Sequence, residues 1–356
     1  MNQHAPSNRF SCERRIFLAA LIVFVTNIAF GAEKKSPIEP EKKEVVPARQ
    51  LQICPSGREL VITDPAQMPA MLEKLEKMIP ETPDEAEELR GNKVFLLFNI
   101  AIGEARKSQY ENAVAHLRAA HDLCGKDWNP EIRMNMNYTL ATVHMQYGHY
   151  EDALPLAKTV LAYRERTVGP EHPNTLRIAY TVAVLQSKTG ERAAAETLCR
   201  RVLKVREQSL GSEHEETLLP ITLLAALCVE KGDTAAAETL YLRALKIQER
   251  LYGPDQPPTL STLDFLANIY ADNGNSTAAE PLLLRALDAR GRMLGNNHPD
   301  TCRTALILAV LYDKQKKISK ALPLAEQALK GYTNTLGGGH QYTIRAKKLV
   351  ESLKTQ

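Results

Sequence analysis

The chain has 356 residues, of which 44% are hydrophobic but only 6% are aromatic. Such a composition, rich in Ala and Leu, favours close-packed helices over sheets, because sheets draw on β-branched and aromatic residues. The net charge is +3, from 45 basic and 42 acidic residues, and no run of basic residues lies on one predicted face. A nucleic-acid partner is therefore not expected.

Residues 1–31 have the layout of a secretory signal. A basic stretch precedes an apolar segment, residues 16–30, and the small residues Ala29 and Gly31 lie at −3 and −1 of a cleavage site. The apolar segment is shorter than the about 20 residues that a membrane-spanning helix needs. We therefore expect cleavage and export to the periplasm or the outside of the cell. The alternative is an uncleaved anchor in the inner membrane, with the domain outside the cytoplasm.

Two further segments are expected before the main domain. Residues 32–50 are charged and contain prolines, which predicts a flexible linker. Residues 51–82 form an N-terminal segment with an apolar stretch at 59–63, compatible with a short strand, and one short helix from Met68 to Ile79. The sequence Thr82-Pro83-Asp84-Glu85 is a capping box that starts the next helix.

The rest of the chain repeats with a period of 42 residues. The period appears in two glycine series and two alanine series: Gly169, Gly211, Gly253, Gly295 and Gly337; Gly148, Gly190, Gly232 and Gly274, with Lys316 at the fifth place; Ala141, Ala183, Ala225, Ala267 and Ala309; and Ala153, Ala195, Ala237, Ala279 and Ala321. Coincident series at one period indicate a stack of similar structural units.

Each unit is predicted to be a helical hairpin. In one example a loop at 169–175 of the form Gly-x-x-His-Pro-x-Thr leads into a helix from Leu176 to Lys188. Gly190 ends that helix in a conformation with positive φ, and a second helix follows from Arg192 to Gln208. The alanines of the two helices are expected to face each other, because small side chains let helices approach closely.

This pattern resembles tetratricopeptide repeats in the 42-residue form typical of kinesin light chains, most clearly in residues 263–282. The resemblance implies an all-α, right-handed α-solenoid of helix-turn-helix repeats. We expect six repeats at 83–337, the first degenerate, and a capping helix at 338–356 that carries Lys347, Lys348 and Lys354. The paired asparagines of kinesin light chains are absent: the matching places are Tyr138/Thr139, Tyr180/Thr181, Thr222/Leu223, Asp264/Phe265 and Leu306/Ile307.

No pattern in the sequence predicts catalysis, a metal or a cofactor. The histidines at 172, 214, 298 and 340 recur once per repeat, so their side chains lie too far apart to share one metal ion. We expect them to pack the loops. His116, His121, His144 and His149 are interpreted as ordinary surface and packing residues. Phosphate-binding, nucleophile-elbow, zinc-protease and Cys-x-x-Cys motifs are absent from the sequence.

The cysteines suggest packing more than chemistry. Cys199 and Cys228 occupy positions that hold apolar residues in sister repeats, so we expect small buried side chains. Cys54 and Cys124 could pair in an exported protein if residues 51–82 fold onto the first hairpin.

The candidate site is a groove lined by the first helices, which would bind a protein or peptide. A basic and aromatic first half and an acidic second half are expected, the latter through Glu230, Asp264 and Asp272. An acidic or extended segment would suit the first half. The predicted contact residues are Asn99, Arg106, Asn135, Tyr138, Arg177, Tyr180, Lys188, Asn268 and Arg303.

Overall fold

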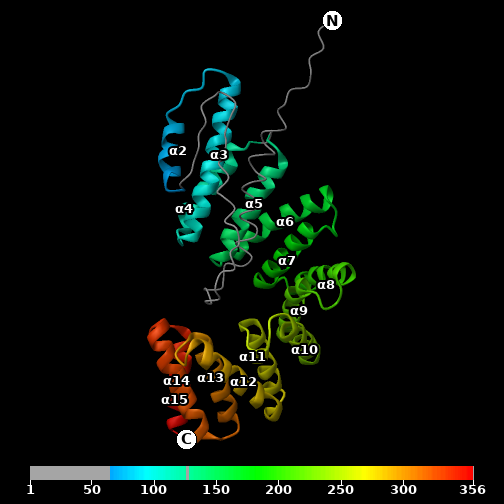
Figure 1. Ribbon diagram of the computed structural model, residues 1–356, viewed down its shortest axis with the longest axis vertical. Helices are drawn as coiled ribbons and strands as arrows, with labels where there is room; N and C mark the ends of the chain where they lie inside the picture. The colour runs from blue at the N-terminus through cyan, green and yellow to red at the C-terminus, as the bar shows by residue number, and fades with distance from the viewer. Residues whose placement is uncertain (1–64, 126–127, 356) are drawn as a thin grey trace. The chain divides into compact units, whose positions relative to one another are not determined.

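The computed structural model describes residues 65–125 and 128–355 (Figure 1), and within these ranges every regular element is helical. The chain divides into two compact units, Met1–Gly169 and Pro170–Gln356, which are treated separately. The predicted all-α solenoid class is confirmed by successive pairs of packed helices. None of the helices in the described ranges is long and apolar enough to cross a membrane.

The described part of the first unit contains a short 3-10 helix, Pro65–Gln67, followed by helices α2 to α6. Their bounds are α2 Met68–Glu76, α3 Pro83–Arg106, α4 Tyr110–Leu123, α5 Pro130–Gln146 and α6 Tyr150–Thr167. The short helix expected from Met68 therefore ends three residues earlier than predicted. Cys54 and the stretch at 59–63 lie outside the described residues.

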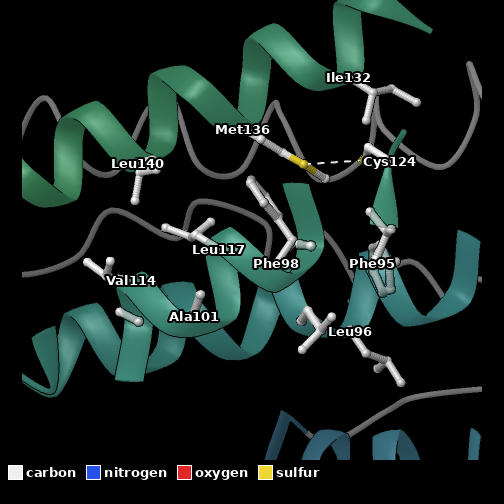
Figure 2. Packing of buried hydrophobic residues seen from close by; sticks show 14 of the residues in the cluster. Phe95, Leu96, Phe98, Ala101, Val114, Leu117, Cys124, Ile132, Met136 and Leu140 are labelled. Atoms are coloured by element: carbon white, nitrogen blue, oxygen red, sulfur yellow. Dashed lines mark hydrogen bonds between the residues drawn. The ribbon is translucent and has the colours of Figure 1, made fainter. Parts of the chain in front are cut away.

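The core of the first unit lies between α3, α4 and α5. Figure 2 shows Phe98, Leu117 and Met136 meeting there from the three helices, and all are at most 3% exposed. The Cys124 thiol is buried and free, and its Sγ donates to Met136 Sδ at 3.5 Å. Thr82 Oγ1 accepts from the Glu85 N–H at 3.2 Å and starts α3, as the capping box predicts.

The second unit continues with four helix pairs and a lone last helix. Their bounds are α7 Pro173–Lys188, α8 Arg192–Leu210, α9 Leu218–Lys231, α10 Thr234–Leu251, α11 Pro257–Asp272, α12 Ser276–Leu294, α13 Pro299–Lys314, α14 Ile318–Leu336 and α15 Gln341–Lys354. On α15, Lys347 and Glu351 stand where α13 has the fully buried Ala305 and Ala309. These two charged side chains lie 3.9 Å apart, so the last helix has a polar outer side.

The alanine series are buried on both helices of each pair. Ala183 of α7 and Ala195 of α8 are both 0% exposed, and the same holds for the equivalent pairs in the next three hairpins. A side chain larger than alanine at these places would push the helices apart, because protein interiors are already close-packed. The period in the sequence is therefore the period of the helix contacts.

The recurring histidines cap the starts of first helices or, for His214, of the short 3-10 helix Glu215–Thr217 that leads into α9. Nδ1 of His172 accepts from the Asn174 N–H at 3.2 Å, and His214, His298 and His340 bond in the same way to the residue two places on, each at 3.2 Å. An imidazole nitrogen thus satisfies one of the free donors at the helix start, as Ser or Asp commonly do. The histidines were expected to pack the loops, and this hydrogen bond shows how each of them does so.

Glycines end the first helices, as Gly190 does with a φ of +86°. Lys316 stands at the equivalent place in the last hairpin and has a φ of +59°, which is unfavourable for a residue with a Cβ. Nothing in the fold requires a lysine there, since the four sister positions are glycine.

Replacing Lys316 with Gly should therefore stabilise the second unit by up to about 1 kcal/mol. The change removes the strain of the left-handed backbone conformation, and the greater conformational entropy of glycine in the unfolded chain offsets part of that gain. Gly274→Ala, the opposite change one repeat earlier, should destabilise it by a similar amount. Urea midpoints of the two variants, measured side by side, check the prediction. A Lys316→Gly midpoint below that of the parent would contradict it.

Candidate protein-binding face

The exposed side of the first helices in the second unit forms a candidate binding surface, here called the first-helix face. Residues four apart on a helix lie one above the other, so two rows of equivalent positions make up this face. One row is Arg177, Leu219, Ser261, Arg303 and Arg345; the other is Thr181, Leu223, Phe265, Ile307 and Leu349. Helix α7 contacts α9, α11 contacts α13, and α13 contacts α15.

Two large apolar side chains stand out in the middle of this face. Leu219 is 53% exposed and Phe265 is 50% exposed. The Phe265 ring stacks on the buried ring of Tyr241 from α10, with centroids 5.2 Å apart and an interplanar angle of 16°. Phe265 is therefore held in place by the core while half its surface meets solvent, which suits a preformed contact site.

Cationic side chains lie on the same row as Leu219. Arg177 is half-buried, Arg345 is exposed, and the Arg303 side chain is 42% exposed. Arg303 Nη2 lies 3.4 Å from carboxylate oxygens of both Asp264 and Asp300, so part of its charge is already neutralised within the unit.

The predicted contact residues of the first unit differ in exposure. Arg106 is exposed, Tyr138 and Asn99 are half-buried, and the Asn99 amide donates to the Phe95 carbonyl at 2.8 Å. Asn135 is buried, and its Oδ1 accepts from Arg164 Nη2 at 3.1 Å. Asn135 thus has an internal partner that the repeat register did not reveal.

The predicted contact residues of the second unit are more accessible. Lys188 and Asn268 are exposed, although the Asn268 amide donates to the Asp264 carbonyl at 3.0 Å. Tyr180 is half-buried, and burial raises the pKa of its phenol to about 12. Asn135 and Tyr138 belong to one unit, and Arg177, Tyr180 and Lys188 to the other.

The expected acidic half of the groove is wrong at Asp264, which is buried, whereas the side chains of Asp272 and Glu230 are 72% and 42% exposed and form surface ion pairs. Asp264 is 3% exposed and pairs with Arg290 at 2.7 Å. Asp272 pairs with Lys314 at 3.1 Å, and Glu230 with Arg192 at 2.7 Å. The middle of the face is apolar instead, through Leu219 and Phe265.

Asp264 belongs to a buried polar cluster that joins three helices. Arg290 of α12 bonds to Asp264 of α11 and to the Thr304 hydroxyl of α13, and that hydroxyl donates to Asp264 Oδ1 at 3.1 Å. Burial raises the pKa of the Asp264 carboxyl, against the opposing effect of Arg290 and Arg303. Desolvation of the carboxylate thus outweighs the attraction of its partners.

The arginine in this cluster occupies a recurring buried position of the second helices. The equivalent residues are Arg164, Arg206, Gln248, Arg290 and Tyr332. Four of them are 5% exposed or less, and Gln248 Oε1 accepts from the Thr262 hydroxyl at 2.7 Å. A polar residue that recurs at the period on an otherwise apolar stripe is the sequence signal that would have revealed this position.

Other potential sites offer little. An open depression of about 510 Å³ is lined by Gln186, Ala193, Ala194, Thr197, Leu198 and Arg201, and none of the predicted contact residues lines it. The predicted packing role of two cysteines is supported, since Cys199 and Cys228 are 0% and 4% exposed, and burial raises the pKa of Cys199 to about 12. Among the described residues, no three His, Cys, Asp or Glu side chains are placed to hold a metal.

Comparison with known families settles the class of the fold. The model of the tetratricopeptide repeat family matches residues 132–208, 187–250, 219–290 and 258–334, which together span more than half of the chain. The chain belongs to the tetratricopeptide repeat family. No curated protein matches its sequence.

Solved structures place this repeat protein among the kinesin-light-chain-like members. A crystal structure of Podosopora anserina putative kinesin light chain repeats, 25% identical, has a TM-score of 0.51 and covers 57% of this chain and 96% of its own. BtubC from P. vanneervenii, 19% identical, has a TM-score of 0.51 with 70% and 93% covered. A signal transduction ATPase of Pyrococcus horikoshii with a tetratricopeptide repeat sensor, 14% identical, has a TM-score of 0.56 with 82% and 43% covered.

The cluster around Asp264 leads to a stability prediction, because the next repeat has uncharged side chains at the equivalent buried positions. Leu306 and Tyr332 stand at the places of Asp264 and Arg290 and lie in one apolar cluster. Asp264→Leu alone should destabilise the second unit by about 3 kcal/mol, since it leaves Arg290 buried without its main partner.

The double variant Asp264→Leu, Arg290→Tyr should recover to within about 1 kcal/mol of the parent, because no unpaired buried charge remains. Chemical denaturation of the parent, both single variants and the double variant closes the cycle. Additive losses would show that the two side chains do not depend on each other.

Proposed function

We propose that this tetratricopeptide repeat protein is an exported, non-enzymatic scaffold that binds a partner polypeptide on the first-helix face. The observation that carries the proposal is the half-exposed pair Leu219 and Phe265 in the middle of that face. Exposed apolar side chains held by a rigid core are characteristic of interaction surfaces. The repeat fold supports the same class, since stacked repeats create extended surfaces used for binding.

The chemistry of the face indicates the kind of segment it would take. Apolar side chains of the partner would cover Leu219 and Phe265, and carboxylates would meet Arg177 and Arg345. Phe265 is already fixed against Tyr241, so little conformational entropy is lost when a partner packs on it. The patch predicted from the sequence, with Arg177, Tyr180 and Lys188, would extend this surface along α7.

The binding proposal is tested by a matched pair of double variants of the full chain. Leu219→Ala with Phe265→Ala should weaken binding at least about 30-fold, as expected when truncation at a hot spot loses about 2 kcal/mol. Leu242→Ala with Leu284→Ala is the control, because these side chains are 45% and 46% exposed on the second helices α10 and α12.

The measurement is affinity capture from an envelope extract, identification of the partner by mass spectrometry, and titration of the purified partner. Equal binding by the two double variants would contradict the proposal. Arg177→Ala with Tyr180→Ala then tests the patch predicted from the sequence. Thermal melting of every variant checks that the fold is retained.

Export is a second element of the proposal, and it rests on the sequence of residues 1–31. If the signal is cleaved, the mature protein should begin near Ala32 and appear in the soluble periplasmic or external fraction. Sequencing the N-terminus of the natural protein checks this. An intact N-terminus in the membrane fraction would favour a membrane-tethered assembly factor, held by residues 16–30 with the linker setting its reach.

A further inference from the structure

One recurring position of the first helices bonds to the preceding hairpin where it holds a tyrosine or a histidine. Its residues are His144, Gln186, Cys228, Tyr270 and Tyr312. In the second unit, Tyr270 Oη donates to Glu238 Oε1 of the preceding α10 at 2.9 Å, and Tyr312 Oη donates to Glu280 Oε1 of the preceding α12 at 2.8 Å. These two bonds connect consecutive hairpins.

The first unit makes this connection with a histidine. His144 of α5 is 2% exposed, and its Nδ1 lies 2.8 Å from the Tyr110 hydroxyl at the start of α4. The Tyr110 ring stacks on His149, with centroids 4.5 Å apart, and packs against Tyr147 at 5.0 Å. Tyr147 Oη donates to the Ala105 carbonyl at the end of α3 at 2.9 Å. The cluster therefore joins the first hairpin, α3 and α4, to the second, α5 and α6.

We propose that His144 is an acid-sensitive latch, and that its uptake of a proton at mildly acidic pH releases the hairpin of α3 and α4 from α5.

The neutral ring suits its surroundings, whereas a charged ring does not. A neutral imidazole can accept the Tyr110 O–H bond at Nδ1. A protonated one donates from both nitrogens, so the Tyr110 hydroxyl would lose its acceptor inside the unit. Placing a cation at a site that is 2% exposed also removes it from water, which is unfavourable unless an anion faces it.

The charges around His144 add to this effect only in part. Arg118 of α4 and His149 before α6 disfavour a second positive charge, whereas Asp152 of α6 favours it. Burial is the larger influence and lowers the pKa of His144. On α3, Glu104 pairs with His116 of α4 at 2.7 Å, and Glu111 acts on Tyr110.

The direction of the pH dependence follows from this lowered pKa. The unfolded chain binds a proton at the ordinary value for histidine, about 6.5, and the folded chain only at lower pH. Between these two values the unfolded state holds more protons, so stability falls as the pH falls. The tyrosine connections of the second unit do not change in this range, since burial raises the pKa of Tyr312 to about 12.

The single tryptophan of the chain provides the readout. Trp128 lies just before α5, is 8% exposed and belongs to the buried cluster of the first unit. Urea unfolding of the full chain, followed by Trp128 emission at pH 7.5 and pH 5.0, measures the stability of this unit. The parent should show a severalfold larger unfolding constant at the lower pH.

Two variants separate the latch from general acid effects. His144→Gln places there the residue found at the equivalent Gln186, so the fold should tolerate it, and most of the pH dependence should vanish. His121→Gln, a partly exposed histidine of α4, should keep the dependence of the parent. An unchanged pH dependence in His144→Gln would overturn the proposal.

A second measurement follows the His144 ring directly in the parent protein. Imidazole proton resonances of the parent are followed by NMR through the same pH range, and His144 is assigned by its absence in His144→Gln. Its ring should titrate at lower pH than the exposed histidines. Titration together with them would overturn the proposal even if the variants proved hard to compare.

Discussion

The structure depends on how closely two antiparallel helices can approach. Fully buried alanines on both helices of a pair leave room for that close approach, as with Ala225 and Ala237, which lie in one buried cluster. A hairpin built this way leaves its outer faces uncovered, and only another hairpin of the same shape can cover them. Helix length, loop length and the 42-residue period follow from this contact, because each unit must present the same surface to the next one.

Once that frame is fixed, the remaining contacts between hairpins are free to vary, and they do. The recurring position at Arg290 is an arginine, a glutamine or a tyrosine, and the position at His144 is a histidine, a glutamine, a cysteine or a tyrosine. Their partners change with them: a carboxylate for Arg290, a hydroxyl for Gln248 and an apolar cluster for Tyr332. The buried alanines recur in every repeat, whereas the side-chain partners at each junction between hairpins differ.

This division explains what the sequence could predict. The helices, the glycines with positive φ and the buried alanines follow from local rules that act within one repeat. The outward or inward direction of a polar residue on a first helix depends on its partner 26 to 40 residues away, as with Asp264, Arg290 and Thr304. A periodic register treats Asp264 and Asn268 alike, although one is buried and the other exposed. The apolar centre of the face, at Leu219 and Phe265, could not be predicted either, because the exposure of these side chains depends on how neighbouring helices pack.

Every hairpin in the second unit carries its own start and stop within the same period. A histidine cap, or Pro257 in α11, opens the first helix, and a glycine or Lys316 closes it. The number of hairpins can therefore change without altering the structure of any one hairpin. A gain or loss of one 42-residue block in the gene would join equivalent loops and leave both signals intact.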